Sequence, residues 1–117
     1  MIRVLIDRKL KKREHISKLI RQIRIAAMAQ QGYISSETLV NTEDKGNITV
    51  ISTWANVESW EKWKASEQRV AMDREIGTLL EHPEVIRTYQ IISTEEMEFL
   101  EDPEGWLQQR ERHSLGG

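Results

Sequence analysis

The sequence predicts an α+β fold of the ferredoxin-like type, in which one antiparallel sheet carries helices on one face. The first observation is a set of four segments with the β-branched, alternating pattern of strands, at residues 2–7, 33–41, 48–54 and 85–92. The second is helical periodicity between the first and second strands and between the third and fourth. Together they indicate the order βαββαβ, and 117 residues is the size of one domain.

The first half of the chain contains one helix and one hairpin. Residues 11–31 place apolar side chains on one helical stripe, and most lysines and arginines lie outside it. Gly32 follows, and glycine readily adopts the left-handed conformation that ends a helix. The polar loop 42–47 then joins the second strand to the third.

The second half contains a split helix and the last strand. Asn56 is the predicted N-cap of a short helix through Lys64, and Ser66 caps a second helix over residues 67–80. Pro83 breaks that helix before the fourth strand.

The chain is expected to divide after residue 93. Residues 1–93 form the ferredoxin-like domain. Residues 94–117 form a helical extension with a frayed end, which begins with a short helix over 94–101. Trp106 and Leu107 make the extension too apolar for a disordered segment. We therefore expect it to pack on the domain or on a partner subunit.

Apolar residues occur on both faces of three predicted strands. In the first strand, Leu5 lies opposite the face that carries Ile2, Val4 and Ile6. The helices cover only one face, and the open face of a monomeric antiparallel sheet is normally polar. The pattern therefore predicts a homodimer that forms through the open sheet face.

Composition and charge exclude several classes of function. The chain has no cysteine, so disulfides, thiolate catalysis and iron–sulfur clusters are excluded. No apolar run is long enough for a membrane span and no signal-peptide pattern opens the chain, so a cytoplasmic protein without membrane contact is expected. Residues 1–30 are basic but hold no aromatic residue that could stack on a base. We interpret them as a solvated helix face, with no nucleic acid as partner.

The histidines do not form a metal site by their spacing. His15, His82 and His113 are isolated from one another, so no metal is predicted. The sequence also lacks a glycine-rich phosphate loop and a nucleophile elbow, which leaves nucleotide chemistry and acyl transfer unsupported.

Several short motifs carry a resemblance to a known family. They are Gln31-Gly32-Tyr33-Ile34, Glu37-Thr38-Leu39, Val50-Ile51-Ser52-Thr53-Trp54 and Glu58-Ser59-Trp60-Glu61-Lys62-Trp63-Lys64-Ala65-Ser66. The chain resembles the antibiotic-biosynthesis monooxygenase-like family of dimeric α+β barrels over about residues 1–93. The resemblance implies an oxygenase, since the family includes cofactor-free oxygenases of polycyclic aromatic substrates, quinol monooxygenases and haem-degrading enzymes.

The haem-degrading branch of that family can be compared by position. It uses an Asn near the end of the first strand, a Trp in the helix after the third strand and a His ten residues beyond that Trp. Trp63 matches, whereas Asp7 and Asp73 stand at the other two positions. A carboxylate is a poorer axial ligand of haem iron than imidazole. We therefore expect no cofactor.

The resemblance makes Asp7, Trp63 and Asp73 the candidate catalytic residues. Trp63 would line an apolar pocket and orient a substrate oxygen, or would simply fill the core under a helix. Asp7 and Asp73 would approach the same pocket as acid–base groups. The structural alternatives are an ion pair of Asp7 with Arg3, Arg8 or Arg87 and a solvated Asp73 beside Arg69 or Arg74.

The preferred interpretation is a cofactor-independent monooxygenase that acts on a small aromatic or quinol-like molecule. One alternative is a non-catalytic dimeric protein that binds a small apolar ligand or haem. The other is a haem-degrading relative with altered ligands. If the chain oxidises anything, the substrate or a bound ligand must supply the electrons.

Overall fold

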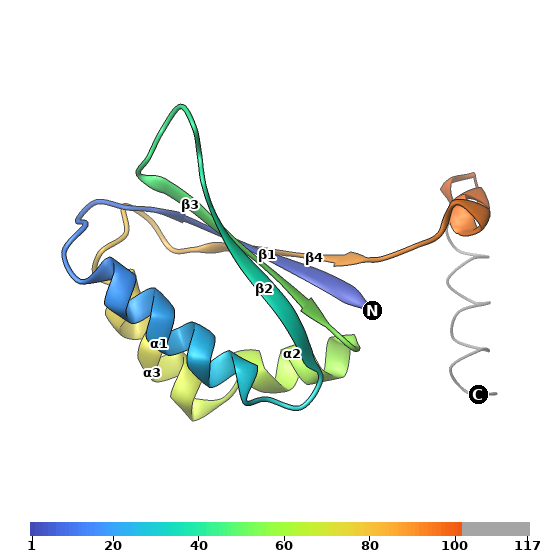
Figure 1. Cartoon of the computed structure of the whole chain (residues 1–117), viewed down its shortest axis with the longest axis horizontal. Coiled ribbons are helices and arrows are strands. Elements are labelled where there is room, and N and C mark those ends of the chain that lie inside the picture. Colours follow the sequence, from blue (N-terminus) through green and yellow to red (C-terminus); the bar gives the residue numbers. More distant parts are fainter. Residues whose placement is uncertain (102–117) are drawn as a thin grey trace.

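The structure, a computed structural model, describes residues 1–101, with Phe99 described by its backbone alone. The elements in chain order are β1 (Ile2–Lys9), α1 (Ile16–Met28), β2 (Tyr33–Val40), β3 (Asn47–Trp54), α2 (Val57–Lys64), α3 (Glu67–Gly77), β4 (Val85–Gln90) and the 3₁₀ helix η1 (Thr94–Leu100). The predicted order βαββαβ, with the second helix split in two, is confirmed (Figure 1).

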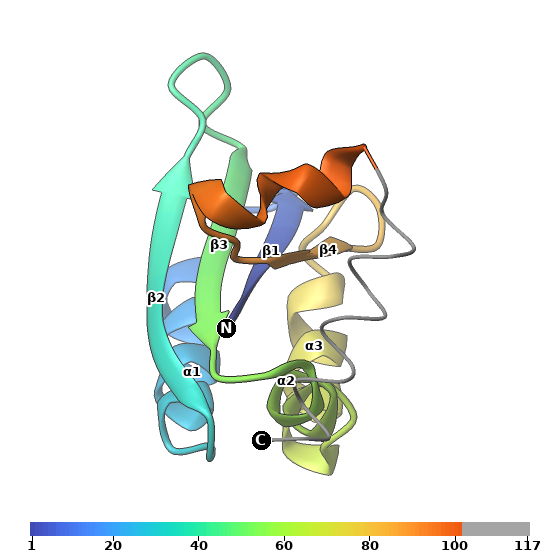
Figure 2. The same cartoon turned by 90° about the vertical axis from the view of Figure 1, so that its right-hand side faces the viewer.

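The four strands form one antiparallel sheet in the order β2-β3-β1-β4. All three α-helices lie on one face of this sheet (Figures 1 and 2). The strand order and the one-sided helices confirm the ferredoxin-like fold class.

Helices α1 and α3 are both shorter than their sequence patterns predicted. The segments that follow β1 and α3 pair with each other: the Lys11 amide donates to the Leu79 carbonyl at 2.8 Å, and Leu10 and Leu80 form an isolated β-bridge. These pairings occupy backbone groups that a longer helix would need, so α1 begins at Ile16 and α3 ends at Gly77.

The two predicted helix caps are confirmed. The side chain of Asn56 accepts a hydrogen bond from the Ser59 amide at 2.9 Å, at the start of α2. The Ser66 hydroxyl accepts one from the Arg69 amide at 3.2 Å, at the start of α3. Each cap satisfies an amide that the first helical turn would leave without a partner, and each places the following turn against the sheet.

Gly32 brings the start of β2 close to α2. It has a φ of +90°, and a Cβ atom there would overlap the Ser59 side chain. Only glycine therefore allows both the backbone conformation and the close approach.

The core lies between the sheet and the helices. The alternating residues Ile2, Val4 and Ile6 of β1 are buried, as the strand pattern predicted. The remaining buried apolar residues are Ile23, Ala26, Trp54, Trp60, Trp63, Ile76 and Leu80.

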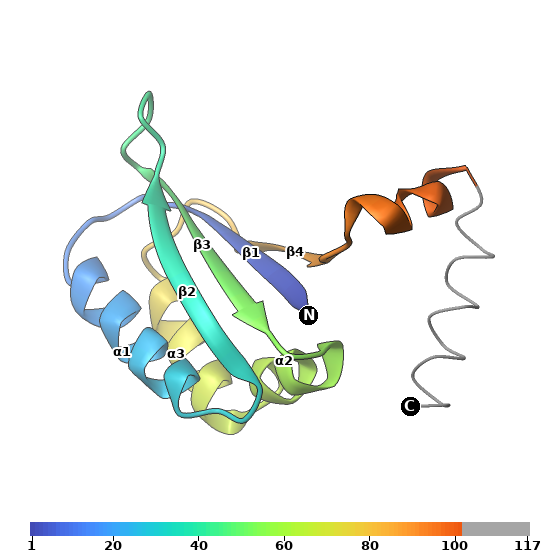
Figure 3. The same ribbon diagram turned by 45° about the vertical axis from the view of Figure 1, so that its right-hand side comes forward.

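The extension after β4 leaves the domain. In Figures 1 and 3, η1 lies beyond the end of β4 and away from the three α-helices. Met97 and Leu100 in η1 are exposed. The predictions for Trp106 and Leu107 concern positions outside the described residues. Within residues 1–101, no helix has the length and apolarity to cross a membrane.

Candidate functional site

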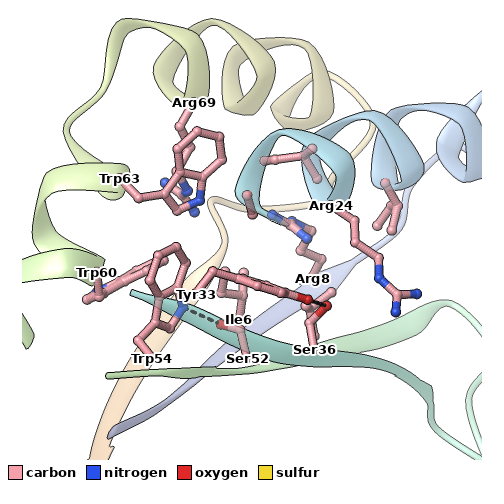
Figure 4. Close-up of a pocket in the computed structure, with 14 residues that line it drawn as sticks. Ile6, Arg8, Arg24, Tyr33, Ser36, Ser52, Trp54, Trp60, Trp63 and Arg69 are labelled. Carbon is pink, nitrogen blue, oxygen red and sulfur yellow. Dashed lines mark hydrogen bonds between the residues drawn. The ribbon is translucent and has the colours of Figure 1, made fainter. Parts of the chain in front are cut away.

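An apolar cavity lies between the sheet and the helices (Figure 4). Its empty space is about 470 Å³, which includes the opening to solvent. The residues that line it are Ile6, Arg8, Ile20, Ile23, Arg24, Ala27, Tyr33, Ser36, Val50, Ser52, Trp54, Trp60, Trp63 and Arg69.

Aromatic side chains form much of the wall. Trp60 and Trp63 are three residues apart in α2, so both face the sheet. Trp54 ends β3 and contacts Tyr33 edge to face, with ring centres 5.6 Å apart, and Trp60 at 5.9 Å. Its indole Nε1 donates to Ser52 Oγ at 3.0 Å, which holds the ring in place.

Two buried arginines stand at the closed end of the cavity. Arg8 of β1 is 2% exposed and Arg69 of α3 is 3% exposed, whereas Arg24 near the opening is exposed. Figure 4 shows Arg69 pointing from its helix toward the sheet and Arg8 rising from the strand. The cavity therefore combines apolar walls with two guanidinium groups at one end.

Two carboxylates compensate these arginines. Glu84 lies 2.9 Å from Arg8 Nη2 and accepts from Arg69 Nη2 at 3.2 Å. Asp73 pairs with Arg69 four residues earlier on α3, and its Oδ1 lies 3.8 Å from Arg8 Nη2. We call these four residues the arginine–carboxylate cluster. The guanidinium carbon of Arg69 also lies 5.2 Å from the centre of the Trp60 ring, a cation–π contact.

Burial changes the acidity of this cluster. Burial lowers the pKa of Arg8 from its ordinary value, and Glu84 and Asp73 oppose that change. Burial also raises the pKa of Asp73 to about 6, with Arg69 and Arg8 acting in the opposite direction and Glu84 adding to the rise. Asp73 therefore changes charge close to neutral pH.

Several donors at the closed end have no acceptor within residues 1–101. Trp60 Nε1 is buried without a partner. The hydrogen bonds of the described residues also leave Trp63 Nε1, Arg8 Nη1 and Arg69 Nε without an acceptor. All four side chains line the cavity. Of these four donors, only Trp60 Nε1 is itself fully buried, and an unpaired buried donor is costly. The other three can be reached by a ligand that brings an acceptor into the cavity.

The three residues singled out from the sequence do not form one constellation. Trp63 lines the cavity, and Asp73 lies behind Arg69 without lining it. Asp7 is on the opposite face of the sheet, where it accepts from Thr49 Oγ1 and from Arg87. The structure thus connects Asp73 to the cavity only through Arg69 and Arg8, and it leaves Asp7 on the other face. Their catalytic roles stay predictions.

Arg8, Arg69 and Glu84 were not predicted from the sequence as members of a site. A signal for Arg8 was present, because it continues the alternation of Val4 and Ile6 and so places a charge on the buried face of β1. A charge in that position needs a buried partner. Glu84 carried no comparable pattern, because it lies in the loop before β4.

The donor set does not fit haem. Asp73 stands where the haem-degrading branch has its axial histidine, and its carboxylate is occupied by Arg69 and Arg8. Within the described part of the chain, no group of three His, Cys, Asp or Glu side chains is placed to hold a metal ion.

Comparisons with known proteins agree with this fold. The oxygenase SnoaB from Streptomyces nogalater, described as cofactor-independent, superposes with a TM-score of 0.72 at 8% identity, over 80% of this chain and 94% of its own. A conserved protein from Methanosarcina mazei Go1 gives 0.70 at 17% identity, over 78% and 92%. An antibiotic biosynthesis monooxygenase gives 0.69 at 16% identity, over 80% and 100%.

No curated protein matches the chain. The family model for antibiotic biosynthesis monooxygenases matches residues 1–74, which include β1 through most of α3 and therefore the cavity walls, Arg8, Arg69 and Asp73. On this match the chain belongs to the antibiotic biosynthesis monooxygenase family.

Proposed function

We propose that this protein is a cofactor-independent monooxygenase of a small aromatic or quinol-like substrate. The observation that carries the proposal is the aromatic-walled cavity with donors at its closed end. Aromatic walls favour an aromatic ring, and the donors favour a ring that carries an oxygen. The description of SnoaB as a cofactor-independent oxygenase supports the same reaction class.

The reaction needs no external reductant. When a ring CH₂ group becomes a carbonyl, it loses two hydrogens and gains one oxygen atom from O₂, and the second oxygen atom leaves as water. The substrate thus supplies all four electrons that reduce O₂. Ionisation of a phenol or enol oxygen on the same ring makes it electron-rich enough to pass an electron to O₂.

Each part of the cavity has a role in this scheme. The indoles of Trp54, Trp60 and Trp63 exclude water and hold the ring, and Trp63 Nε1 donates to a substrate oxygen. The guanidinium of Arg69 stabilises negative charge on that oxygen. Asp73 orients Arg69 and accepts a proton near neutral pH, so it is a positioning residue in this proposal.

Oxygen uptake tests the proposed activity. The purified protein is incubated with hydroquinones and anthrones, and consumption of O₂ is measured with an electrode against Trp63→Phe and a protein-free control. With ¹⁸O₂, one labelled atom should enter the product. Uptake that is no faster than the protein-free rate across the substrate series would contradict the proposal.

One observation favours a second candidate function, a non-catalytic protein that binds a small aromatic ligand. Among residues 1–101, no carboxylate or histidine lines the cavity, so no described side chain there is an evident general base. Ligand binding without oxygen uptake would support this alternative.

The proposal includes a homodimer that forms through the open sheet face. Leu39, Val85 and Tyr89 on that face are 43%, 39% and 50% exposed, and Leu5 and Ile51 lie between them. Exposed apolar side chains of this kind are typical of an interface, and the Asp7–Arg87 ion pair lies among them on the same face. Light scattering at micromolar concentration should give twice the chain mass, and a monomer would contradict this part of the proposal.

The same dimer offers a place for the extension. Because η1 lies away from its own domain with Met97 and Leu100 exposed, we propose that η1 packs on the partner subunit. A variant that lacks 95–117 should form a weaker dimer. Unchanged dimer affinity would contradict this packing.

A further inference from the structure

The closed end of the cavity has an excess of hydrogen-bond donors. Arg8, Arg69 and Trp63 each present an N–H group that no acceptor within residues 1–101 satisfies. The two arginine side chains are almost completely buried, but their unpaired nitrogens are not among the fully buried atoms, so a ligand in the cavity can reach them. A neutral apolar ring would leave these donors unpaired. A ligand with a charged acceptor would satisfy them.

We propose that the cavity takes a planar aromatic anion, with its ionised oxygen held by Arg69, Arg8 and Trp63 Nε1. A phenolate, a carboxylate and a sulfonate share this chemistry. The inference rests on the proposed function only in taking this cavity as the ligand site. It extends the ionised substrate oxygen of that function to aromatic anions in general and couples their binding to a proton.

The charge balance of the arginine–carboxylate cluster links this binding to a proton. With all four groups ionised, Arg8 and Arg69 are balanced by Asp73 and Glu84, so an entering anion adds an uncompensated negative charge. Asp73 has a pKa raised to about 6, chiefly by burial, and a nearby anion raises it further. Uptake of one proton by Asp73 restores the balance.

The charged groups that face Asp73 come from several of the elements packed around it. Arg8 comes from β1, Arg69 from α3 itself and Glu84 from the loop before β4, while the side chains of α2 that line the cavity are tryptophans. The affinity for the anion therefore depends on pH, because the anion binds best when Asp73 is protonated. It is constant below about pH 6 and falls by up to tenfold per pH unit above it, until Asp73 ionises in the complex as well.

Calorimetry with two matched probes tests the proposal. Benzenesulfonate stays ionised across the pH range, and benzenesulfonamide is its neutral counterpart of the same shape. The full-length protein is titrated with each from pH 5 to 8, in two buffers of different ionisation enthalpy. We expect benzenesulfonate to bind roughly tenfold or more tightly than the sulfonamide at pH 6, with proton uptake that rises between pH 6 and 7. Equal affinities for the two probes would overturn the proposal.

Three variants separate the contributions of the cluster. Arg69→Gln should lose roughly tenfold or more in affinity for benzenesulfonate and little for the sulfonamide. Arg74→Gln, an exposed arginine on the same helix, should change neither. Asp73→Asn keeps the shape but not the charge, so it should bind benzenesulfonate more tightly than the wild type at pH 8 and lose the pH dependence. If Arg69→Gln does not fold, Asp73→Asn decides alone: wild-type pH dependence in that variant would overturn the linkage.

The outcome is distinguishable from that of the proposed reaction. Selective binding of benzenesulfonate without oxygen uptake from any substrate supports the anion site and contradicts the oxygenase. Oxygen uptake together with equal affinity for the two probes supports the oxygenase and contradicts the anion site.

Discussion

The guanidinium of Arg69 lies over the ring of Trp60, with 5.2 Å between the guanidinium carbon and the ring centre. The same guanidinium pairs with Asp73 and Glu84. One buried side chain therefore connects the aromatic wall of the cavity, helix α3 and the loop before β4. Replacing Arg69 should therefore lower both the stability of the fold and the affinity of the cavity for its ligand.

Arg69→Met should destabilise the protein by roughly 3–5 kcal/mol, because it leaves two carboxylates partly buried without this partner. The control is Asp44→Asn, which breaks an exposed pair with Lys9 in the loop before β3, away from the proposed interface, and should change stability little. Urea denaturation at one fixed protein concentration measures both. Equal losses in the two variants would show that the cluster contributes no more than a surface ion pair.

The pKa of Asp73 predicts a pH dependence of folding. Its folded-state pKa of about 6 lies above the ordinary 3.8, so the folded protein holds this proton more tightly than the unfolded chain does. This contribution to stability is fully present below about pH 3.8 and is lost as pH rises through 6. Comparison with Asp73→Asn isolates it from the other carboxylates.

The difference in unfolding free energy, wild type minus Asp73→Asn, should therefore fall between pH 4 and pH 6.5. It is measured by urea denaturation across that range. A difference that rises with pH would mean that the arginines lower the pKa of Asp73 and outweigh burial.

Trp63→Phe should impair ligand binding more than folding. The change keeps an aromatic ring in the wall but removes an indole N–H that has no acceptor within residues 1–101, so we expect at least about a tenfold loss in kcat/KM or in ligand affinity. Trp54→Phe is the matched control, because its Nε1 donates to the buried Ser52. That variant should lose roughly 1–3 kcal/mol of stability. If Trp63→Phe lost stability but kept its activity and ligand affinity, Trp63 would be a core residue only.

Asp7→Asn tests the role that the sequence suggested for Asp7. Because Asp7 pairs with Arg87 on the open sheet face, we expect turnover within about threefold of the wild type and a small loss of stability. Oxygen uptake and thermal unfolding are measured together. Loss of turnover at an unchanged melting temperature would instead establish Asp7 as catalytic.

Two glycines should respond to alanine in opposite directions. Gly32→Ala forces a residue with a Cβ into φ +90° and against Ser59, so it should destabilise the protein by roughly 1–3 kcal/mol or more. Gly77→Ala places its methyl group in open space at the end of α3 and should stabilise by about 0.4–1 kcal/mol. Thermal unfolding compares them. A stable Gly32→Ala variant would show that the start of β2 can shift away from α2.

Much of the fold could be predicted because its signals are local. Alternating apolar residues define β1, Asn56 and Ser66 cap the helices they precede, and Gly32 has the backbone conformation that only glycine adopts readily. The ends of α1 and α3 could not be predicted in the same way. They depend on the pairing of Leu10 with Leu80, which are distant in sequence.

The sequence by itself determined the order of the elements, the buried face of β1 and the position of Trp63 in the helix after β3, because each follows from spacing along one element. Only the tertiary structure decided which charges meet. Asp7 and Arg8 are neighbours in sequence, yet the alternation of a strand sends Asp7 to the open face and Arg8 to the cavity. The partners Asp73 and Glu84 reach Arg8 only when α3 and the loop before β4 fold against β1.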